Sequence, residues 1–344
     1  MTVAIWRRCS SDAGAGLREG EPALQLFLPI EGRKLLATQP SPDGTAMDAI
    51  KAEEIVQNIL CQGNQELSKL LNADVLAISS PMTFGLDSLI KNEIENINEE
   101  EDGFDKLIVV LETPGGYIEV VERIVSVFRQ HYKEVEYIIP NYAYSAGTVL
   151  ALSGDEIHMN YYSVLGPIDP QFQTEGGRTV PGLGYIAKFN ELRRVINSVP
   201  DDNISDIRAE MAFLLKKFDP AQLFHIEQAI KHSQELLEKW LPLYKFKNWK
   251  KTESGKKVDA KYRVERAQHI AAVLGDAEHW HSHGRGISMI DLASDKIGLK
   301  VNDFGADADL SANITHYHGL FSDYMQTSGV SAAIHTRHRM RRVS

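Results

Sequence analysis

The stretch KLIVVLETPGGYIEVVERIVSVFRQHYKEVEYIIPNYAYSAGTVLALSGDEIHM (residues 106–159) alternates strand and helix patterns without a long break. Three runs, LIVVL, VEYII and DEIHM, have the length of strands, and LIVVL is apolar throughout, which is typical of a strand covered on both faces. Between these runs lie an amphipathic helix pattern at 117–132 and a short helix pattern that Gly154 closes. Strands that alternate with helices predict parallel neighbours joined by crossover helices, and therefore an α/β fold.

Two glycine-bearing turns follow two successive strands of this stretch, so parallel pairing places both turns at one edge of the sheet. The first turn, TPGG, exposes the backbone N–H groups of Gly115 and Gly116, and glycine lets a ligand approach that backbone closely. The second turn presents Ser145 at a helix N-terminus, followed by Ala146, where free N–H groups favour negative charge. Two donors beside one hydroxyl suggest an oxyanion hole with its nucleophile. A helix N-terminal serine is also a common cap, so both interpretations of Ser145 stay open.

Further elements are expected on both sides of this stretch. The sequence favours helices at 46–71, 85–97, 219–244, 260–275 and 287–299, and a strand at 74–80. The Gly-rich segment 161–184 is expected to be a long functional or mobile loop, and the charged segment 247–259 a linker or loop.

We expect four parts along the chain. They are a partly irregular and helical N-terminal segment (1–73), a catalytic core (74–200), a helical C-terminal region (201–325) and a flexible basic tail (326–344). The tail contains the basic run HTRHRMRR (residues 335–342), which is expected to fray rather than to bind a partner.

Composition limits the classes of function. The 344 residues carry a net charge of −10, which argues against a nucleic-acid binder held by general electrostatics. Two cysteines cannot form a disulfide framework, which makes a reducing compartment the default. No run approaches the roughly 20 apolar residues of a membrane helix, and no secretory signal pattern is present. We therefore expect a cytoplasmic protein that does not insert into membranes.

The motifs ETPGGYIEVVERI, YSAGTVLALSGDEIHM and LGPIDPQ occur in this order within residues 74–172. Together they resemble the serine dehydrogenase proteinase family, in the clan of the Clp protease proteolytic subunit, signal peptide peptidase A and the crotonases. The resemblance implies a spiral of ββα units with helical C-terminal additions, and a homo-oligomer. It implies Ser145 as nucleophile and backbone N–H groups of Gly116 and Ala146 as the oxyanion hole, with Gly115 in the same turn. Many relatives carry membrane helices, and this chain departs from them in that respect.

A nucleophilic serine needs a base, and the sequence offers two candidates. In the peptidase A branch the base is a lysine downstream of the serine, and Lys188 lies 43 residues after Ser145. Such a lysine can act only if desolvation lowers its pKa. The family resemblance also points to His283, shortly before an isoleucine. Asp169 could orient a base or could stabilise the turn before Pro170, and the turn role is favoured.

A rival interpretation of the histidine cluster is metal binding. His279, His281 and His283 would share one side only in an extended strand, and no cysteine supports a zinc site, so no metal and no cofactor are expected.

Three functions follow from these observations. The leading one is an ATP-independent serine peptidase that cleaves peptides or unfolded segments through an acyl-enzyme on Ser145. A crotonase-type enzyme would use the same donors on an acyl-CoA thioester without a nucleophilic serine, and an inactive oligomeric scaffold would only bind peptides. The peptidase needs Ser145, whereas the thioester enzyme would survive its loss.

Overall fold

The computed structural model describes residues 52–99, 103–173, 179–198, 213–214, 216, 218–276, 280 and 284–343. These residues lie in the second of two units into which the chain divides, Ile50–Ser344. Of the expected N-terminal segment (1–73), residues 1–51 lie outside the described residues, and most of the rest forms a helix, Ala52–Leu71. Among the described residues, no helix is long and apolar enough to cross a membrane.

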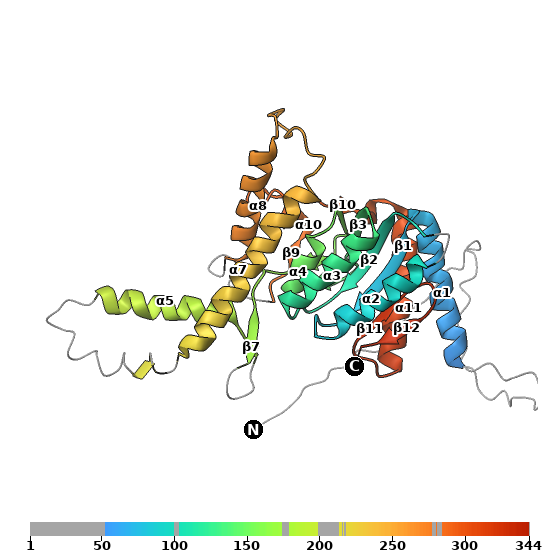
Figure 1. Ribbon diagram of the computed structural model, residues 1–344, viewed down its shortest axis with the longest axis horizontal. Helices are drawn as coiled ribbons and strands as arrows, with labels where there is room; N and C mark the ends of the chain where they lie inside the picture. The colour runs from blue at the N-terminus through green and yellow to red at the C-terminus, as the bar shows by residue number, and fades with distance from the viewer. Residues whose placement is uncertain are drawn as a thin grey trace, which may run out of the picture. The chain divides into compact units, whose positions relative to one another are not determined.

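A seven-stranded sheet forms the centre of the fold, in the order β10-β5-β3-β2-β1-β11-β12 (Figure 1). Its strands are β1 (Asp74–Ser79), β2 (Lys106–Glu112), β3 (Glu134–Ile138), β5 (Glu156–Met159), β10 (Asn302–Asp303), β11 (Ala333–His335) and β12 (Met340–Arg342). The strands from β10 to β1 are parallel, and β11 and β12 add antiparallel pairs at one edge. The parallel pairing predicted from the alternating pattern is therefore confirmed.

Helices cover both faces of the sheet. The helices of the described residues are α1 (Ala52–Leu71), α2 (Leu86–Asn98), α3 (Ile118–His131), α4 (Ala146–Ala151), α5 (Gly182–Ser198), α7 (Pro220–Leu243), α8 (Ala260–Leu274), α10 (Met289–Ala293) and α11 (Ala308–Thr327), with a 3₁₀ turn, η2 (Phe304–Ala306). Side chains of β2 alternate between two cores: Val109 packs with α2, α3 and α4, and Val110 packs with α1 and α11. The continuous apolar run of β2 is explained by this covering of both faces.

Short strands follow the main strands and lead into the helices. These are β4 (Tyr142–Ala143), β6 (Val164–Leu165) and β9 (Ile287–Ser288), which form a second small sheet, while β7 (Gln171–Gln173) pairs with β8 (Thr179–Pro181). After β1 and β2 the chain forms only single β-bridges, at Met82–Gly116 and Thr113–Ala143, in the places where short strands follow the other main strands. Each unit therefore runs main strand, short strand and helix, which is the ββα arrangement that the sequence predicted.

Three local predictions differ from the structure. Within 161–184, residues expected to form only a loop include β6 and the hairpin β7–β8. The helix expected at 287–299 begins at Met289, because Ile287 and Ser288 pair with β6 and Ser288 then forms a capping box with Asp291. That helix ends at Ala293, and Gly298 lies in a left-handed turn at φ 60°.

The prediction of a flexible basic tail is also wrong where Ala333–His335 and Met340–Arg342 form β11 and β12 at the sheet edge. A buried carboxylate explains the order: Glu93 accepts hydrogen bonds from Arg339 and lies 3.5 Å from Arg341. Because a buried charge must be paired, the arginines bind the tail to α2.

His335 makes stability depend on pH. It is 1% exposed, its Nδ1 lies 2.7 Å from the Tyr317 hydroxyl, and burial lowers its pKa from 6.5 to about 4. Between these values the unfolded chain binds a proton that the folded chain does not. We therefore expect the free energy of unfolding to decrease as pH falls from 6.5 to 4, with a His335 contribution of up to about 1.4 kcal/mol per pH unit.

Denaturant unfolding at several pH values checks this slope. His335→Gln should flatten the dependence, whereas His316→Gln, at an exposed position of α11, should leave it unchanged. An unchanged slope in His335→Gln would contradict the assignment.

Candidate active site

The two predicted turns lie side by side at the carboxyl edge of the sheet. Thr113 N–H donates to the Tyr142 carbonyl (3.1 Å), and Tyr144 N–H donates to the Thr113 carbonyl (3.0 Å). A Cβ atom added to Gly115 would lie 2.9 Å from Ser145 Cβ and 2.6 Å from the Tyr144 oxygen. The TPGG turn therefore needs glycine at Gly115, because its backbone touches the turn that carries Ser145.

Ser145 has a backbone conformation that serine rarely adopts. Its φ of 52° and ψ of −119° lie outside the ordinary regions, and the residue is only 7% exposed. It stands at the N-cap position of α4, yet its side chain makes no capping hydrogen bond. Instead, Ser145 Oγ donates to the carbonyl of Asp169 at 2.9 Å. The strained backbone turns the hydroxyl away from its own helix, so side-chain capping does not explain this serine.

The candidate oxyanion donors differ in whether their N–H groups are already used. Gly115 N–H donates to Thr113 Oγ1 at 3.1 Å, which leaves it engaged inside the turn. Within the described part of the chain, the N–H groups of Gly116 and Ala146 have no hydrogen-bond acceptor. They are the two donors that the family resemblance implies.

Met82 holds the first turn in place. Met82 N–H donates to the Gly115 carbonyl and its carbonyl accepts from Tyr117 N–H, both at 2.8 Å. Gly116 lies between these two bonds with φ 147°, and an added Cβ would lie 2.4 Å from the Met82 oxygen. A side chain at Gly116 would therefore displace the bridge.

Asp169 connects the serine to the helix that carries Lys188. Its carbonyl accepts from Ser145 Oγ, and its buried Oδ1 accepts from Leu183 N–H at 2.8 Å, in the first turn of α5. Asp169 thus links the turn that carries Ser145 to the start of α5.

The structure describes only one of the two predicted bases, Lys188. Lys188 lies on α5, with a side chain 61% exposed and an ion pair to Glu191 at 2.9 Å. It does not have the desolvated surroundings that a lysine base requires. His283, with His279 and His281, lies outside the described residues. Among the residues that the structure does describe, no group of three metal-ligating side chains could hold a metal ion.

Sequence reasoning missed two threonines that shape the site. Thr113 is fully buried, and its Cγ2 would lie 2.2 Å from a Cβ on Gly147, so α4 approaches β2 closely only with glycine there. Thr148 Oγ1 lies 2.8 Å from the carbonyls of both Ala143 and Gly166 and accepts from Gly166 N–H. A threonine on the inward side of a short apolar helix was the signal for this network.

Two solved structures are similar to this chain over about a third of its length. A lysine-to-alanine mutant of the 1510-N membrane-bound stomatin-specific protease, in complex with a substrate peptide, is 25% identical and covers 33% of this chain and 54% of that one, with a TM-score of 0.28. An asparagine-to-aspartate mutant of ClpP1 from Listeria monocytogenes is 14% identical and covers 29% of this chain and 58% of that one, with a TM-score of 0.25.

Among curated proteins, the uncharacterized proteins MJ0137 and MJ1495 of Methanocaldococcus jannaschii are each 41% identical over 63 residues. The matched segment is 18% of this chain and 22% of each relative, so it spans about a fifth of their length. Residues 98–181 match the sequence model of the ClpP-like SDH-type serine proteinases, a range that contains both turns and Asp169. This match confirms the resemblance predicted from the motifs: over residues 98–181, the chain is similar to the ClpP-like SDH-type serine proteinases.

Proposed function

We propose that this chain is a serine peptidase that attacks peptide bonds with Ser145. One observation carries the proposal: the backbone of Ser145 is strained and its hydroxyl caps no helix, while in the described part of the chain the N–H groups of Gly116 and Ala146, on the same two adjoining turns, have no acceptor. Strain of this kind persists only where the surrounding structure enforces it, and it is concentrated at functional sites. The family match over 98–181 supports the same reaction class.

In this proposal each group has a part in acyl transfer. Ser145 Oγ attacks the carbonyl carbon of the scissile bond, and its proton passes to a base. The N–H groups of Gly116 and Ala146 stabilise the negative oxygen of the tetrahedral intermediate. Collapse of that intermediate expels the protonated amine and leaves an ester on Ser145, which water then hydrolyses.

For the base we propose Lys188. The hydrogen bonds of Asp169 fix the first turn of α5 to Ser145, and Lys188 lies about one turn further along this helix. Its ion pair with Glu191 must break, and its ammonium must lose solvent, before it can accept a proton. A homo-oligomer that covers α5 would supply this desolvation.

Removal of the base should separate the two candidates. We expect Lys188→Ala to lower kcat by about 10³-fold, in the range of a lost general base, while His283→Ala changes kcat by less than about tenfold. Steady-state kinetics with one fluorogenic peptide, measured from neutral to alkaline pH, checks this. The reverse order of effects would transfer the role to His283.

The substrates proposed are peptides and unfolded protein segments, and the sequence contains no phosphate-binding loop, so hydrolysis should need no ATP. The test is release of new amino termini from an unfolded protein by the purified chain without nucleotide. Peptide hydrolysis supports the proposal. Binding of coenzyme A together with turnover of an acyl-CoA thioester, and no peptide cleavage, would replace it with the crotonase-type reaction.

A further inference from the structure

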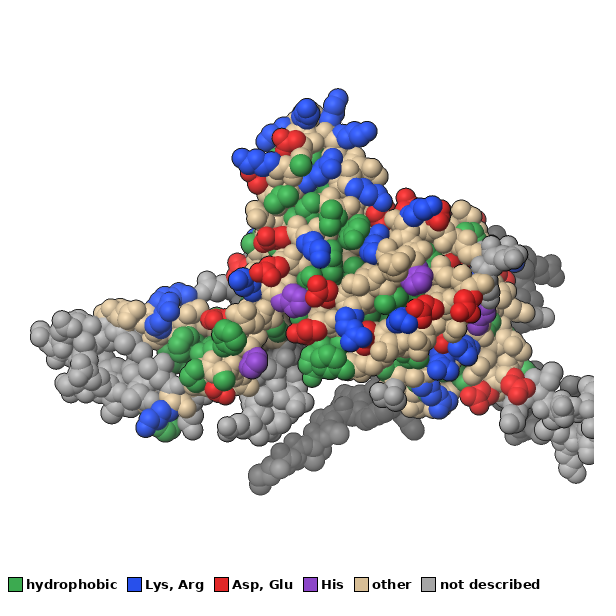
Figure 2. All heavy atoms as spheres, viewed as in Figure 1, with side chains coloured by type: hydrophobic (Ala, Val, Ile, Leu, Met, Phe, Trp, Pro, Cys, Tyr) green, Lys and Arg blue, Asp and Glu red, His purple; other side chains and the backbone are tan. Residues whose placement is uncertain are grey.

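The connection between α7 and α8 is an ordered basic hairpin rather than the loose linker expected from its charge. Lys251 and Lys257 are antiparallel bridge partners, flanked by hydrogen bonds from Thr252 N–H to the Lys256 carbonyl and from Val258 N–H to the Lys250 carbonyl, both 2.9 Å. We call residues 250–257 (KKTESGKK) the lysine hairpin. It holds four lysines against one glutamate in a chain of net charge −10. Figure 2 shows Lys and Arg side chains gathered at this end of α7 and α8.

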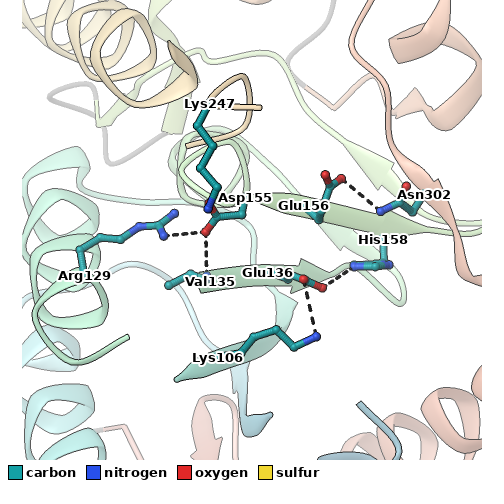
Figure 3. Close-up of polar contacts among 9 residues, drawn as sticks. All are labelled: Lys106, Arg129, Val135, Glu136, Asp155, Glu156, His158, Lys247 and Asn302. Carbon is teal, nitrogen blue, oxygen red and sulfur yellow. Dashed lines mark hydrogen bonds and ion pairs between the residues drawn. The ribbon is translucent and has the colours of Figure 1, made fainter. Parts of the chain in front are cut away.

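Two lysines that precede the hairpin, Lys245 and Lys247, form ion pairs with carboxylates of the core. Lys247 Nζ lies 2.5 Å from Asp155 Oδ1, and the other oxygen of Asp155 accepts from Arg129 and from Val135 N–H (Figure 3). Lys245 pairs with Glu156. Burial alone would raise the pKa of Asp155, but the hydrogen bonds, that of Lys247 foremost, hold it below its ordinary value. The base of the hairpin is therefore fixed by paired charges.

The four hairpin lysines differ from Lys245 and Lys247 in their surroundings. All are exposed, and none forms an ion pair with a carboxylate among the described residues. Lys251 and Lys257 face each other as a non-hydrogen-bonded pair, the kind in which opposite side chains are closer. Like charges directly opposite destabilise such a pair, and an anion bound between them would remove that repulsion.

The position of the hairpin separates it from the active site. Asp155 and Glu156 stand at the amino end of β5, whereas the turns with Gly116 and Ser145 follow the carboxyl ends of β2 and β3. A partner on the hairpin would therefore occupy the opposite edge of the sheet and leave Ser145 accessible.

We propose that the lysine hairpin binds the surface of an anionic phospholipid bilayer. Its positive charges are all lysines, which attract phosphates as point charges and lack the planar fork with which arginine binds a single group. The nearest indole, Trp249, is half-buried, packs against Phe246 and Tyr262 and donates to the Lys251 carbonyl, so it is used within the fold rather than presented on the surface as a stacking platform for nucleic-acid bases. Clustered lysines on a projecting turn suit a flat anionic surface, and several copies in an oligomer would add their weak affinities.

The test is co-sedimentation of the full chain with vesicles of phosphatidylcholine alone or with about 30% phosphatidylserine. We expect binding only to the anionic vesicles, and loss of binding as salt rises from about 0.1 M to about 0.5 M. Replacement of all four hairpin lysines by glutamine should weaken binding by at least about 100-fold, since each lysine contributes about fivefold.

A control variant carries the same change in net charge elsewhere. Lys69, Lys91, Lys133 and Lys231 are exposed lysines on other elements, and their replacement by glutamine should leave vesicle binding within about threefold of the parent. Equal loss in both variants would overturn the proposal, as would absence of phosphatidylserine-dependent binding. Lysine-dependent binding of a duplex oligonucleotide without vesicle binding would also overturn it.

A local measurement tests the repulsion itself. Lys251→Glu replaces the like-charged pair with an opposite-charged one, so the amide hydrogens of Thr252 and Val258 should exchange about two- to fivefold more slowly. The same variant should bind anionic vesicles more weakly. Faster exchange would contradict the idea that the hairpin keeps an unrelieved repulsion.

Discussion

Ser145→Ala is expected to lower kcat for peptide hydrolysis by about 10⁴-fold or more, as loss of the nucleophile does in other serine peptidases. The physical reason is the absence of the attacking oxygen, since the N–H groups of Gly116 and Ala146 remain in place. The substitution removes one hydrogen bond, from Ser145 Oγ to the Asp169 carbonyl, so stability should change by only about 1 kcal/mol.

The matched control is Ser153→Ala, at the other end of the same helical segment. Ser153 is also buried and bonds the Leu150 carbonyl and the Tyr137 hydroxyl, so its loss should cost about 1 kcal/mol of stability and leave kcat unchanged. Steady-state kinetics and thermal unfolding of both variants give the comparison. Full activity in a folded Ser145→Ala variant would remove Ser145 from the mechanism.

Gly116→Ala should lower both kcat and stability, because it combines a strained backbone with a steric clash. At φ 147°, alanine is disfavoured, and its Cβ would lie 2.4 Å from the Met82 oxygen. The bridge to Met82 must move, and the Gly116 N–H moves with it. We expect a loss of about 10²- to 10³-fold in kcat, the usual effect of one missing oxyanion donor, and about 1–3 kcal/mol of stability.

Gly85→Ala separates backbone strain from loss of the donor. Gly85 also has a positive φ, 98°, but an added Cβ there meets nothing within 4 Å. This variant should lose about 1 kcal/mol of stability and keep its kcat. Equal kcat values for Gly116→Ala and the parent chain would show that the Gly116 N–H does not stabilise the transition state.

The sequence predicted the elements whose partners lie nearby along the chain. The apolar run of β2 indicated covering on both faces, and Val109 and Val110 do pack in different cores. The glycines of the TPGG turn and the YSAG segment indicated two turns at one edge, because parallel strands bring their carboxyl ends together. These inferences needed only periodicity, turn residues and the handedness of crossovers.

What the sequence could not predict depends on contacts between distant residues. The tail has a charged composition typical of a frayed end, and only Glu93, a buried acid far back in the chain, explains why Arg339 is ordered. The lysine hairpin likewise has the composition of a linker, and its order depends on Asp155 and Glu156 at the start of a distant strand.

In the candidate site too, some features could be predicted from the sequence and others depend on the folded chain. Ser145 could be named as a candidate nucleophile from its turn, but its strained φ and its bond to the Asp169 carbonyl are properties of the folded chain. Lys188 was chosen by spacing, and spacing says nothing about exposure, which decides whether a lysine can act as a base.

The central claim is that Ser145 is an activated nucleophile. The most direct measurement is treatment of the purified chain with a fluorophosphonate, followed by peptide mass spectrometry to locate the adduct, with Ser145→Ala and Ser153→Ala treated in parallel. The account predicts one adduct, on Ser145, that is absent from Ser145→Ala and present in Ser153→Ala. A folded, oligomeric chain that acquires no adduct on Ser145 while it cleaves peptides would contradict it.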